Sequence, residues 1–121
     1  MSGLVGVVMT SRLPRFYDLK PQERVEALSR STGVSREAMD VLTSGLSLEQ
    51  ADRMIENVIG VYGLPLGLAA NFVVNGREVL VPMAVEEPSV VAGASKAALA
   101  ARQSGGFEAE ATASLMVGQV Q

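Results

Sequence analysis

The sequence predicts an α+β fold in which short N-terminal helices precede a β-hairpin and a buried central helix. Two β-prone runs are joined by Asn75-Gly76, the strongest short-range signal for a hairpin. Residues 90–101 are almost all small and apolar, and Gly105-Gly106 offers a stop after them. Because alanine or glycine stands on nearly every side of this helix and lets neighbouring elements approach closely, we expect the helix to be buried in the middle of a domain.

The first part of the chain is predicted to form an arm followed by short helices. Pro14 keeps residues 11–17 out of a helix, and Pro21 suits the first position of a helix that runs through Leu28. Ser35 can cap a second short helix. Both helices are too short to be stable without tertiary contacts.

A third helix is predicted to begin at Leu48, because Ser47 is followed three residues later by glutamine, the spacing of a capping box. Apolar residues then repeat at helical spacing as far as Ile59, and we expect them to face a core or a partner. Glu56 lies on the opposite side of this helix. The pattern alone favours a solvent-facing acidic surface over a commitment of Glu56 and Asn57 to specific partners.

The two runs of the predicted hairpin are residues 68–74 and 77–81, and the second leads directly to a pair of adjacent glutamates. Beyond the central helix, residues 107–114 alternate between apolar and polar, which predicts a half-buried strand. Residues 115–121 begin another strand-like run. Because a strand without a partner is a liability in an intact domain, we expect the chain to be the front part of a longer protein.

The composition restricts the chemistry available to this chain. It has 121 residues, a net charge of −3 and only ten basic residues, which argues against a nucleic-acid surface. It contains neither cysteine nor histidine, so thiolate metal sites and histidine catalysis are excluded. Glycine, proline and asparagine interrupt the uncharged residues 57–76, which argues against a membrane span. We therefore expect a soluble, cytoplasmic protein without nucleic-acid or membrane partners.

The adjacent Glu86 and Glu87 precede Pro88, which suits the first turn of the central helix. Three interpretations of this pair remain open. Carboxylates at a helix N-terminus gain about 0.3 to 1 kcal/mol from the helix dipole, which is a purely structural role. They could also contribute oxygen ligands to Mg²⁺ or Ca²⁺, given further donors. A general acid would require burial that keeps a carboxyl group protonated near neutral pH.

Six short motifs follow one another along the chain. They are Glu56-Asn57-Val58-Ile59-Gly60, Leu64-Pro65, Asn75-Gly76 ahead of a Val-Pro-Met strand, Val85-Glu86-Glu87-Pro88-Ser89-Val90-Val91-Ala92, Gly105-Gly106-Phe107 and Met116-Val117-Gly118-Gln119-Val120. In this order they resemble the N-terminal portion of 3-hydroxy-3-methylglutaryl-coenzyme A (HMG-CoA) reductase in its soluble, bacterial-type (class II) form. The resemblance covers most of residues 11–121, and the combination of motifs is highly specific.

The resemblance implies an oxidoreductase that interconverts HMG-CoA and mevalonate plus coenzyme A, using two hydride transfers with NADPH or NADH and no metal. It also implies a homodimer whose active site lies at the subunit interface. By position, Glu87 matches the catalytic glutamate, while Ser89 matches a residue that contacts the carboxylate end of HMG. Glu56 and Asn57 match a segment that lines the active site at the dimer interface. Glu86 is expected to play a supporting role.

The same resemblance assigns residues 1–49 to an arm and small helical region, and residues 50–121 to the first part of the substrate-binding domain. The family's catalytic lysine, aspartate and histidine and its nicotinamide-binding domain lie further along. Lys20 and Lys96 are not at the motif position of that lysine, and no glycine-rich dinucleotide fingerprint is present. We therefore expect the cofactor to be bound by a domain outside this chain and the segment alone to be inactive. The alternative is a truncated, non-catalytic fragment that acts only as a dimerisation or binding module.

Overall fold

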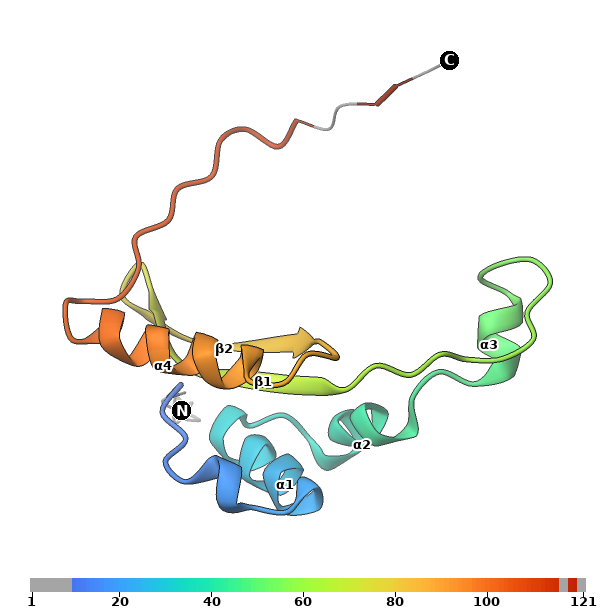
Figure 1. The fold of residues 1–121 in the computed structure, drawn as a ribbon, viewed down its shortest axis with the longest axis horizontal. Coiled ribbons are helices and arrows are strands. Elements are labelled where there is room, and N and C mark those ends of the chain that lie inside the picture. Colours follow the sequence, from blue (N-terminus) through green and yellow to red (C-terminus); the bar gives the residue numbers. More distant parts are fainter. Residues whose placement is uncertain (1–9, 116–117, 120–121) are drawn as a thin grey trace, which may run out of the picture.

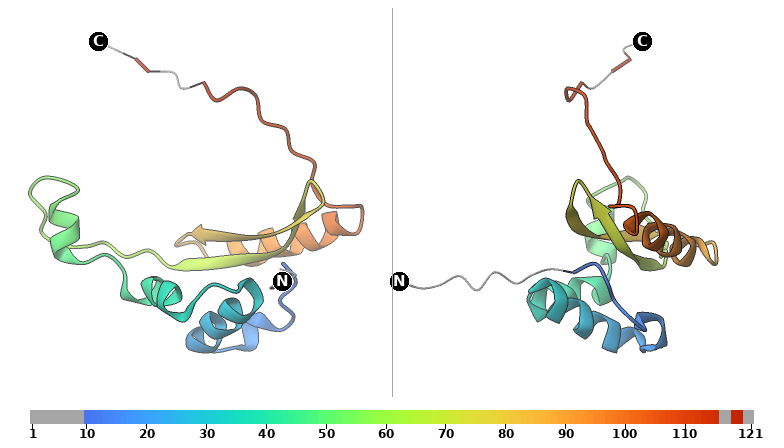
Figure 2. Two further views of the ribbon diagram at one scale, coloured as in Figure 1. Left: turned by 180° about the vertical axis from the view of Figure 1, so that it is seen from behind. Right: turned by 90° about the vertical axis from the view of Figure 1, so that its left-hand side faces the viewer.

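The computed structural model describes residues 10–115 and 118–119, and Figure 1 shows helices arranged around one β-hairpin. The elements are η1 (Phe16–Asp18), α1 (Pro21–Thr32), α2 (Arg36–Ser44), α3 (Leu48–Asp52), β1 (Leu66–Val74), β2 (Arg77–Ala84) and α4 (Val90–Arg102). Helix α4 packs against the hairpin through β1, while α1 and α2 lie along another side of it (Figure 2). The predicted α+β class is confirmed.

The first two helices begin where the sequence predicts. Pro21 stands in the first turn of α1, and Gly33, in the left-handed conformation with φ of 70°, ends the helix. The hydroxyl of Ser35 accepts the backbone N–H of Ala38 at 3.3 Å and so caps α2. Residues next to these helix ends in the sequence therefore form hydrogen bonds with backbone groups that the helices leave without a partner.

Helix α3 has the predicted start but not the predicted length. The N–H of Gln50 donates to Ser47 Oγ at 3.2 Å, and Gln50 Oε1 accepts the N–H of Ser47 at 3.0 Å, which confirms the capping box. The helix ends at Asp52, so the prediction that it continues to residue 59 is wrong. Met54 and Ile55 are 68% and 65% exposed. The residues after Asp52 therefore lack the tertiary packing that would stabilise a longer helix.

The hairpin is confirmed, and both strands are longer than predicted. Asn75 and Gly76 have φ of 50° and 73°, the pair of positive values that a two-residue hairpin turn requires. The strands pair antiparallel from Val74 opposite Arg77, and the register shifts between Ala69 and Phe72. This irregularity contains Asn71, whose φ of 72° is accommodated by a short polar side chain.

Helix α4 packs against β1 but leaves several of its residues exposed, so the expectation that it is buried in the middle of a domain is wrong for the described residues. Ala98 is the one residue of this helix that is buried. Its neighbour Leu99 is 43% exposed. Within residues 10–115 and 118–119, β1 is the main element that packs against the helix.

The predicted strand at residues 107–114 is also wrong. Phe107 forms a single parallel bridge with Val74 and stacks on Phe72, with ring centroids 5.6 Å apart. The residues after it are exposed and irregular up to residue 115. An alternating pattern does not form a strand by itself, because a β-strand needs a neighbouring strand to pair with. Of the last predicted run, residues 116, 117, 120 and 121 lie outside the described residues.

A hydrogen-bonded group joins the N-terminal arm to the hairpin and to the end of α4. Ser11 is fully buried, and its backbone N–H donates to Glu78 Oε2 at 2.9 Å. Its hydroxyl lies 2.8 Å from the carbonyl oxygen of Phe72, and its own carbonyl accepts the N–H of Asn71 at 2.8 Å. Arg102 donates to both carboxylate oxygens of Glu78, including Nη1 to Oε2 at 2.9 Å.

The ionised form of Glu78 is strongly favoured in this group. Hydrogen bonds from Arg102 and then from Ser11 lower the pKa of Glu78 from 4.5 to about 2, despite a smaller opposing effect of burial. Because the pKa is lower in the folded protein, the associated stabilisation is present above about pH 4.5. It is lost as the pH falls through about 2.

We therefore predict that Glu78→Gln lowers the free energy of unfolding at pH 7 by about 1 kcal/mol. The difference from the unmodified protein should shrink as the pH falls from 4.5 to 2. Urea unfolding of the protein at its native length, at a series of pH values, measures this. The exposed Glu110→Gln provides the control, and an equal effect of both substitutions would contradict the prediction.

Candidate active-site segments

Residues 85–89 join β2 to α4 and contain two of the predicted site residues, Glu87 and Ser89 (Figure 1). The backbone N–H of Val85 donates to the carbonyl oxygen of Pro65 at 3.1 Å. This bond ties the end of β2 to the residue immediately before β1. The loop therefore leaves the hairpin from a fixed point.

Ser89 turns the chain from this loop into α4. It has φ of 70° and ψ of −9°, and its carbonyl oxygen accepts the N–H of Gly93 at 2.8 Å. Because Ser89 is left-handed, the helix begins at Val90, and Pro88 lies in the preceding turn rather than in the first helical turn as predicted. The Ser89 side chain does not cap the helix, so the first N–H groups of α4 are available to another acceptor.

Glu86 and Glu87 are both exposed, together with Pro88 and Ser89. The burial that a general acid requires is therefore not provided by the described residues. The sequence analysis expected the apolar residues before the pair to cover it. Instead, residues 78–81 of β2 are half-buried and Pro82 and Ala84 are exposed, so the apolar residues before the pair do not enclose it.

Ser95 fixes the start of α4 against the bulged part of β1. Its hydroxyl accepts the N–H of Ala70 at 3.0 Å and donates to the carbonyl of Val91 at 2.9 Å. The side-chain amide of Asn71 donates to the carbonyl of Ser95 at 3.1 Å. These bonds hold the helix, and with it the loop that carries Glu87, in one position on the hairpin.

The close contact between α4 and β1 also depends on Gly67. A Cβ atom at this position would lie 2.8 Å from Cγ2 of Val91, so a larger residue would push the helix away from the strand. Sequence analysis did not identify Gly67, Asn71 or Ser95 as positioning residues. The available signal was an asparagine inside a β-prone run, which is typical of a bulge.

Glu56 and Asn57 lie in the bend after α3, where Asn57 has φ of 55°. Both residues are exposed. Figures 1 and 2 show α3 and this bend standing apart from the hairpin and from the start of α4. The structure therefore brings Glu87 and Ser89 together in one loop, while Glu56 and Asn57 lie in a different part of the fold.

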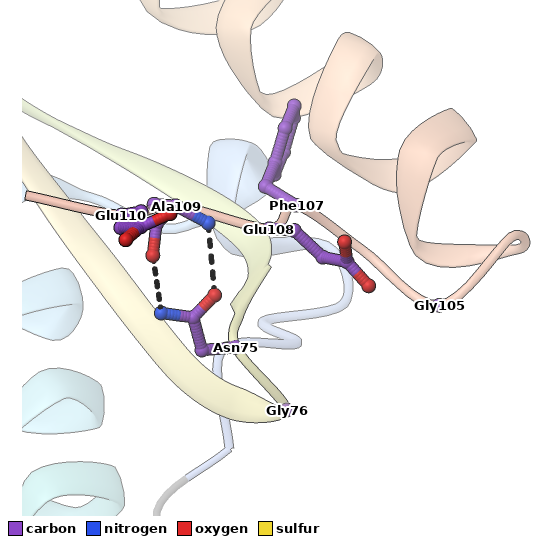
Figure 3. A pocket seen from close by; sticks show the side chains of 7 residues that line it. All are labelled: Asn75, Gly76, Gly105, Phe107, Glu108, Ala109 and Glu110. Atoms are coloured by element: carbon purple, nitrogen blue, oxygen red, sulfur yellow. Dashed lines mark hydrogen bonds between the residues drawn. The ribbon is translucent and has the colours of Figure 1, made fainter.

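A polar depression of about 580 Å³ lies beside the hairpin turn and contains none of the predicted site residues (Figure 3). The side-chain amide of Asn75 donates to the carbonyl of Ala109 and accepts its N–H, both at 2.9 Å. The carboxylates of Glu108 and Glu110 line the same depression. A dinucleotide would bring negative phosphates to these carboxylates, so the depression does not fit such a cofactor.

A second cavity, a cleft of about 990 Å³, lies between the hairpin and helices α1 and α2. Arg24 is the only basic residue among those that line it, and its guanidinium already donates to the carbonyls of Phe16 and Tyr17. The cleft therefore also lacks the cationic cluster that a pyrophosphate group would need. Neither of these two cavities therefore fits a nicotinamide nucleotide.

Residues 10–115 and 118–119 contain no group of three or more histidine, cysteine, aspartate or glutamate side chains placed to hold a metal ion. In the same part of the chain, no helix combines the length and the apolar character needed to cross a membrane.

Comparison with known proteins identifies a matching family. The family model described as hydroxymethylglutaryl-coenzyme A reductase matches residues 20–121. A 3-hydroxy-3-methylglutaryl-coenzyme A reductase from Archaeoglobus fulgidus is 54% identical over 121 residues, which cover 99% of this chain and 28% of the relative. One from Catharanthus roseus is 30% identical over 113 residues, covering 85% of this chain and 18% of the relative.

The fold matches solved structures as well. The class II 3-hydroxy-3-methylglutaryl-CoA reductase from Streptococcus pneumoniae, bound to NADPH in open conformations, aligns with a TM-score of 0.72 and 39% identity. The alignment covers 78% of this chain and 26% of that one. This chain thus spans between 18% and 28% of the length of these similar proteins.

We predict that Ser95→Ala lowers the free energy of unfolding by about 1 to 3 kcal/mol, because it leaves the partly buried N–H of Ala70 without its acceptor. Chemical denaturation measures the loss, and hydrogen exchange at Ala70 should become faster. The control is Ser44→Ala, which removes an exposed hydroxyl on α2 and should change stability by less than about 0.5 kcal/mol. Similar losses for both variants would contradict the proposed role of Ser95.

Proposed function

Because the chain belongs to the hydroxymethylglutaryl-coenzyme A reductase family, we propose that it forms the N-terminal part of an enzyme that interconverts HMG-CoA and mevalonate plus coenzyme A. The reaction passes two hydrides between NADPH or NADH and the substrate. The observation that supports this most directly is the loop of residues 85–89. It carries the motif that resembles the family's catalytic segment, and its position on the hairpin is fixed by the contacts of Val85 and Ser95.

Within this proposal, Glu87 is the catalytic residue. Its carboxyl group donates a proton or a hydrogen bond to the substrate carbonyl oxygen as negative charge develops there. Ser89, two residues later, contacts the carboxylate end of the HMG group. The N-terminus of α4 adjoins this loop and is not capped by the Ser89 side chain, and the positive end of the helix dipole there favours a negatively charged ligand. The exposed Glu86 plays a supporting role.

The active site is completed at the interface of a homodimer. Acid catalysis works best where water is excluded, and the exposed Glu87 needs a covering surface that the described residues do not supply. Glu56 and Asn57 stand apart from Glu87 within one chain. We assign them to the active site of the partner subunit, where they reach the substrate bound beside the partner's loop. The exposed apolar side chains near them, such as Met54 and Ile55, suit such an interface.

The cofactor belongs to another part of the enzyme. The two cavities described above do not fit a nicotinamide nucleotide, and the Streptococcus pneumoniae protein in the matching structure is bound to NADPH. In this proposal residues 1–49 form an arm and small helical region, and residues 50–121 begin the substrate-binding domain. A cytoplasmic location is part of the same proposal, as the resemblance to the class II form implies.

A second candidate function is a non-catalytic dimerisation or binding module. It is favoured by the apolar side chains that remain exposed after α3, at Met54, Ile55 and Ile59. Such a module would associate through these residues without any need for Glu87. Substitution of Glu87 therefore separates the two candidates.

We predict that Glu87→Gln lowers kcat by about 10² to 10⁴-fold, because glutamine cannot donate the catalytic proton. The affinity for HMG-CoA should change little, since the amide keeps the shape and hydrogen-bonding capacity of the side chain. Steady-state kinetics and equilibrium binding of the enzyme at its native length measure the two effects. Glu86→Gln, the matched control, should reduce kcat far less, and retained activity in Glu87→Gln would remove Glu87 from the mechanism.

A shared active site also predicts complementation between two inactive variants. Glu87→Gln and Glu56→Gln homodimers should each lose activity, because each site lacks one residue. After the subunits are exchanged, mixed dimers contain one site with both glutamates. The mixture should then recover about a quarter of the original activity for random pairing in a two-fold dimer. If mixing restores no activity although subunits have exchanged, Glu56 does not act across the interface.

A further inference from the structure

We propose that Asn71 is a positioning residue for the reductase reaction, acting through Ser95 on the loop that carries Glu87. This inference rests on the proposed function and deepens it. The N–H of Asn71 donates to Ser11 and its side-chain amide to Ser95, and among the described residues it forms no hydrogen bond with residues 85–89. Asn71 therefore acts on the loop only by way of the elements that it joins.

Asn71 belongs to a bulge that turns two consecutive N–H groups of β1 away from β2. The register between the strands shifts at Ala70 and Asn71, which have no partner on β2. The N–H of Ala70 donates instead to Ser95 Oγ at 3.0 Å, and that of Asn71 to the carbonyl of Ser11 at 2.8 Å. The bulge depends on the residue type at this position, because the φ of 72° favours asparagine or glycine.

The side chain of Asn71 completes the attachment of α4 to the bulge. Its Nδ2 donates to the carbonyl of Ser95 at 3.1 Å, while the Ser95 hydroxyl donates to the carbonyl of Val91 at 2.9 Å. Asn71 and Ser95 are both half-buried, so water does not fully replace a hydrogen bond that is lost there. The position of α4 on β1 is therefore set at this pair of residues.

A shift of α4 at Ser95 also moves Ser89 and Glu87. Ser95 follows Ser89 by six residues, which is about 9 Å along a rigid helix. The other end of the loop is held independently, by the bond from the N–H of Val85 to the carbonyl of Pro65. Asn71 thus controls one of the two anchors of the loop. A misplacement of about 1 Å at a reacting group can lower the rate about 10²-fold.

Asn75 is a matched control, because it shares these features at a distance from the loop. It is also left-handed, with φ of 50°, and its amide donates to the backbone carbonyl of Ala109 at 2.9 Å. It stands in the hairpin turn, at the opposite end of the strands from residues 85–89 (Figure 1). A purely structural role predicts the same result at both asparagines, whereas a positioning role predicts an effect on catalysis at Asn71 alone.

The test compares Asn71→Gly with Asn75→Gly in the enzyme at its native length. Glycine keeps the left-handed backbone and removes only the side-chain amide. At a temperature where circular dichroism shows a folded protein, we expect Asn71→Gly to lower kcat about tenfold to hundredfold. The KM for HMG-CoA should change less than about threefold. Asn75→Gly should lower the thermal midpoint of unfolding comparably and leave kcat unchanged.

Asn71→Asp is the second variant, because aspartate keeps the shape of the side chain and tolerates the left-handed conformation but cannot donate to Ser95. It should lower kcat at least as much as Asn71→Gly. Unchanged kcat in either folded Asn71 variant, or an equal loss in Asn75→Gly, would overturn the inference while the proposed function stands. If neither Asn71 variant folds, the role of Asn71 is structural and the inference fails as well. An unmodified enzyme without HMG-CoA-dependent oxidation of NADPH or NADH would overturn both the proposed function and the inference.

Discussion

The contact of Ser11 with Glu78 and Arg102 connects three parts of the chain that are far apart in the sequence. Ser11 belongs to the N-terminal arm, Glu78 to β2 and Arg102 to the last turn of α4. A carboxylate in this position is favourable only because its oxygens receive several donors at once. The arrangement thereby fixes the direction of the arm and joins the far end of α4 to the hairpin. The bonds of Ser95 do the same near the start of that helix.

The rest of the molecule has little packing of its own to add to these bonds. Among the described residues, the buried hydrophobic side chains are Met39, Ala51, Ala69 and Ala98, three of which are alanines. Hydrophobic stabilisation grows with the apolar area removed from water, so this core contributes modestly. Polar contacts at defined points therefore hold the helices in place, while large apolar side chains remain at the surface, where other protein surfaces can cover them.

Sequence analysis succeeded where a structure is determined by residues close together in the chain. Asn75 and Gly76 define the hairpin turn, and Ser47 with Gln50 defines the start of α3, because each pair bonds or bends locally. It could not find contacts between distant residues, such as Ser11 with Glu78, which are 67 positions apart. For the same reason, the C-terminal end predicted for α3 and the strand expected at residues 107–114 were wrong. The resemblance located the loop of Glu87, but its exposure depends on which surfaces surround it.

Asn75 has two structural roles. Its backbone forms part of the hairpin turn, and its side-chain amide makes two hydrogen bonds with the backbone of Ala109. Hydrolysis of that amide to aspartate would keep the oxygen that accepts the N–H of Ala109 but replace the NH₂ donor with a second oxygen. That oxygen would face the carbonyl oxygen of Ala109, and the hydrogen bond between them would be lost. The new negative charge would also lie near Glu108 and Glu110. An asparagine followed by glycine is chemically prone to this change. The hydrogen bonds that attach the segment after α4 to the hairpin turn are therefore expected to weaken as the protein ages.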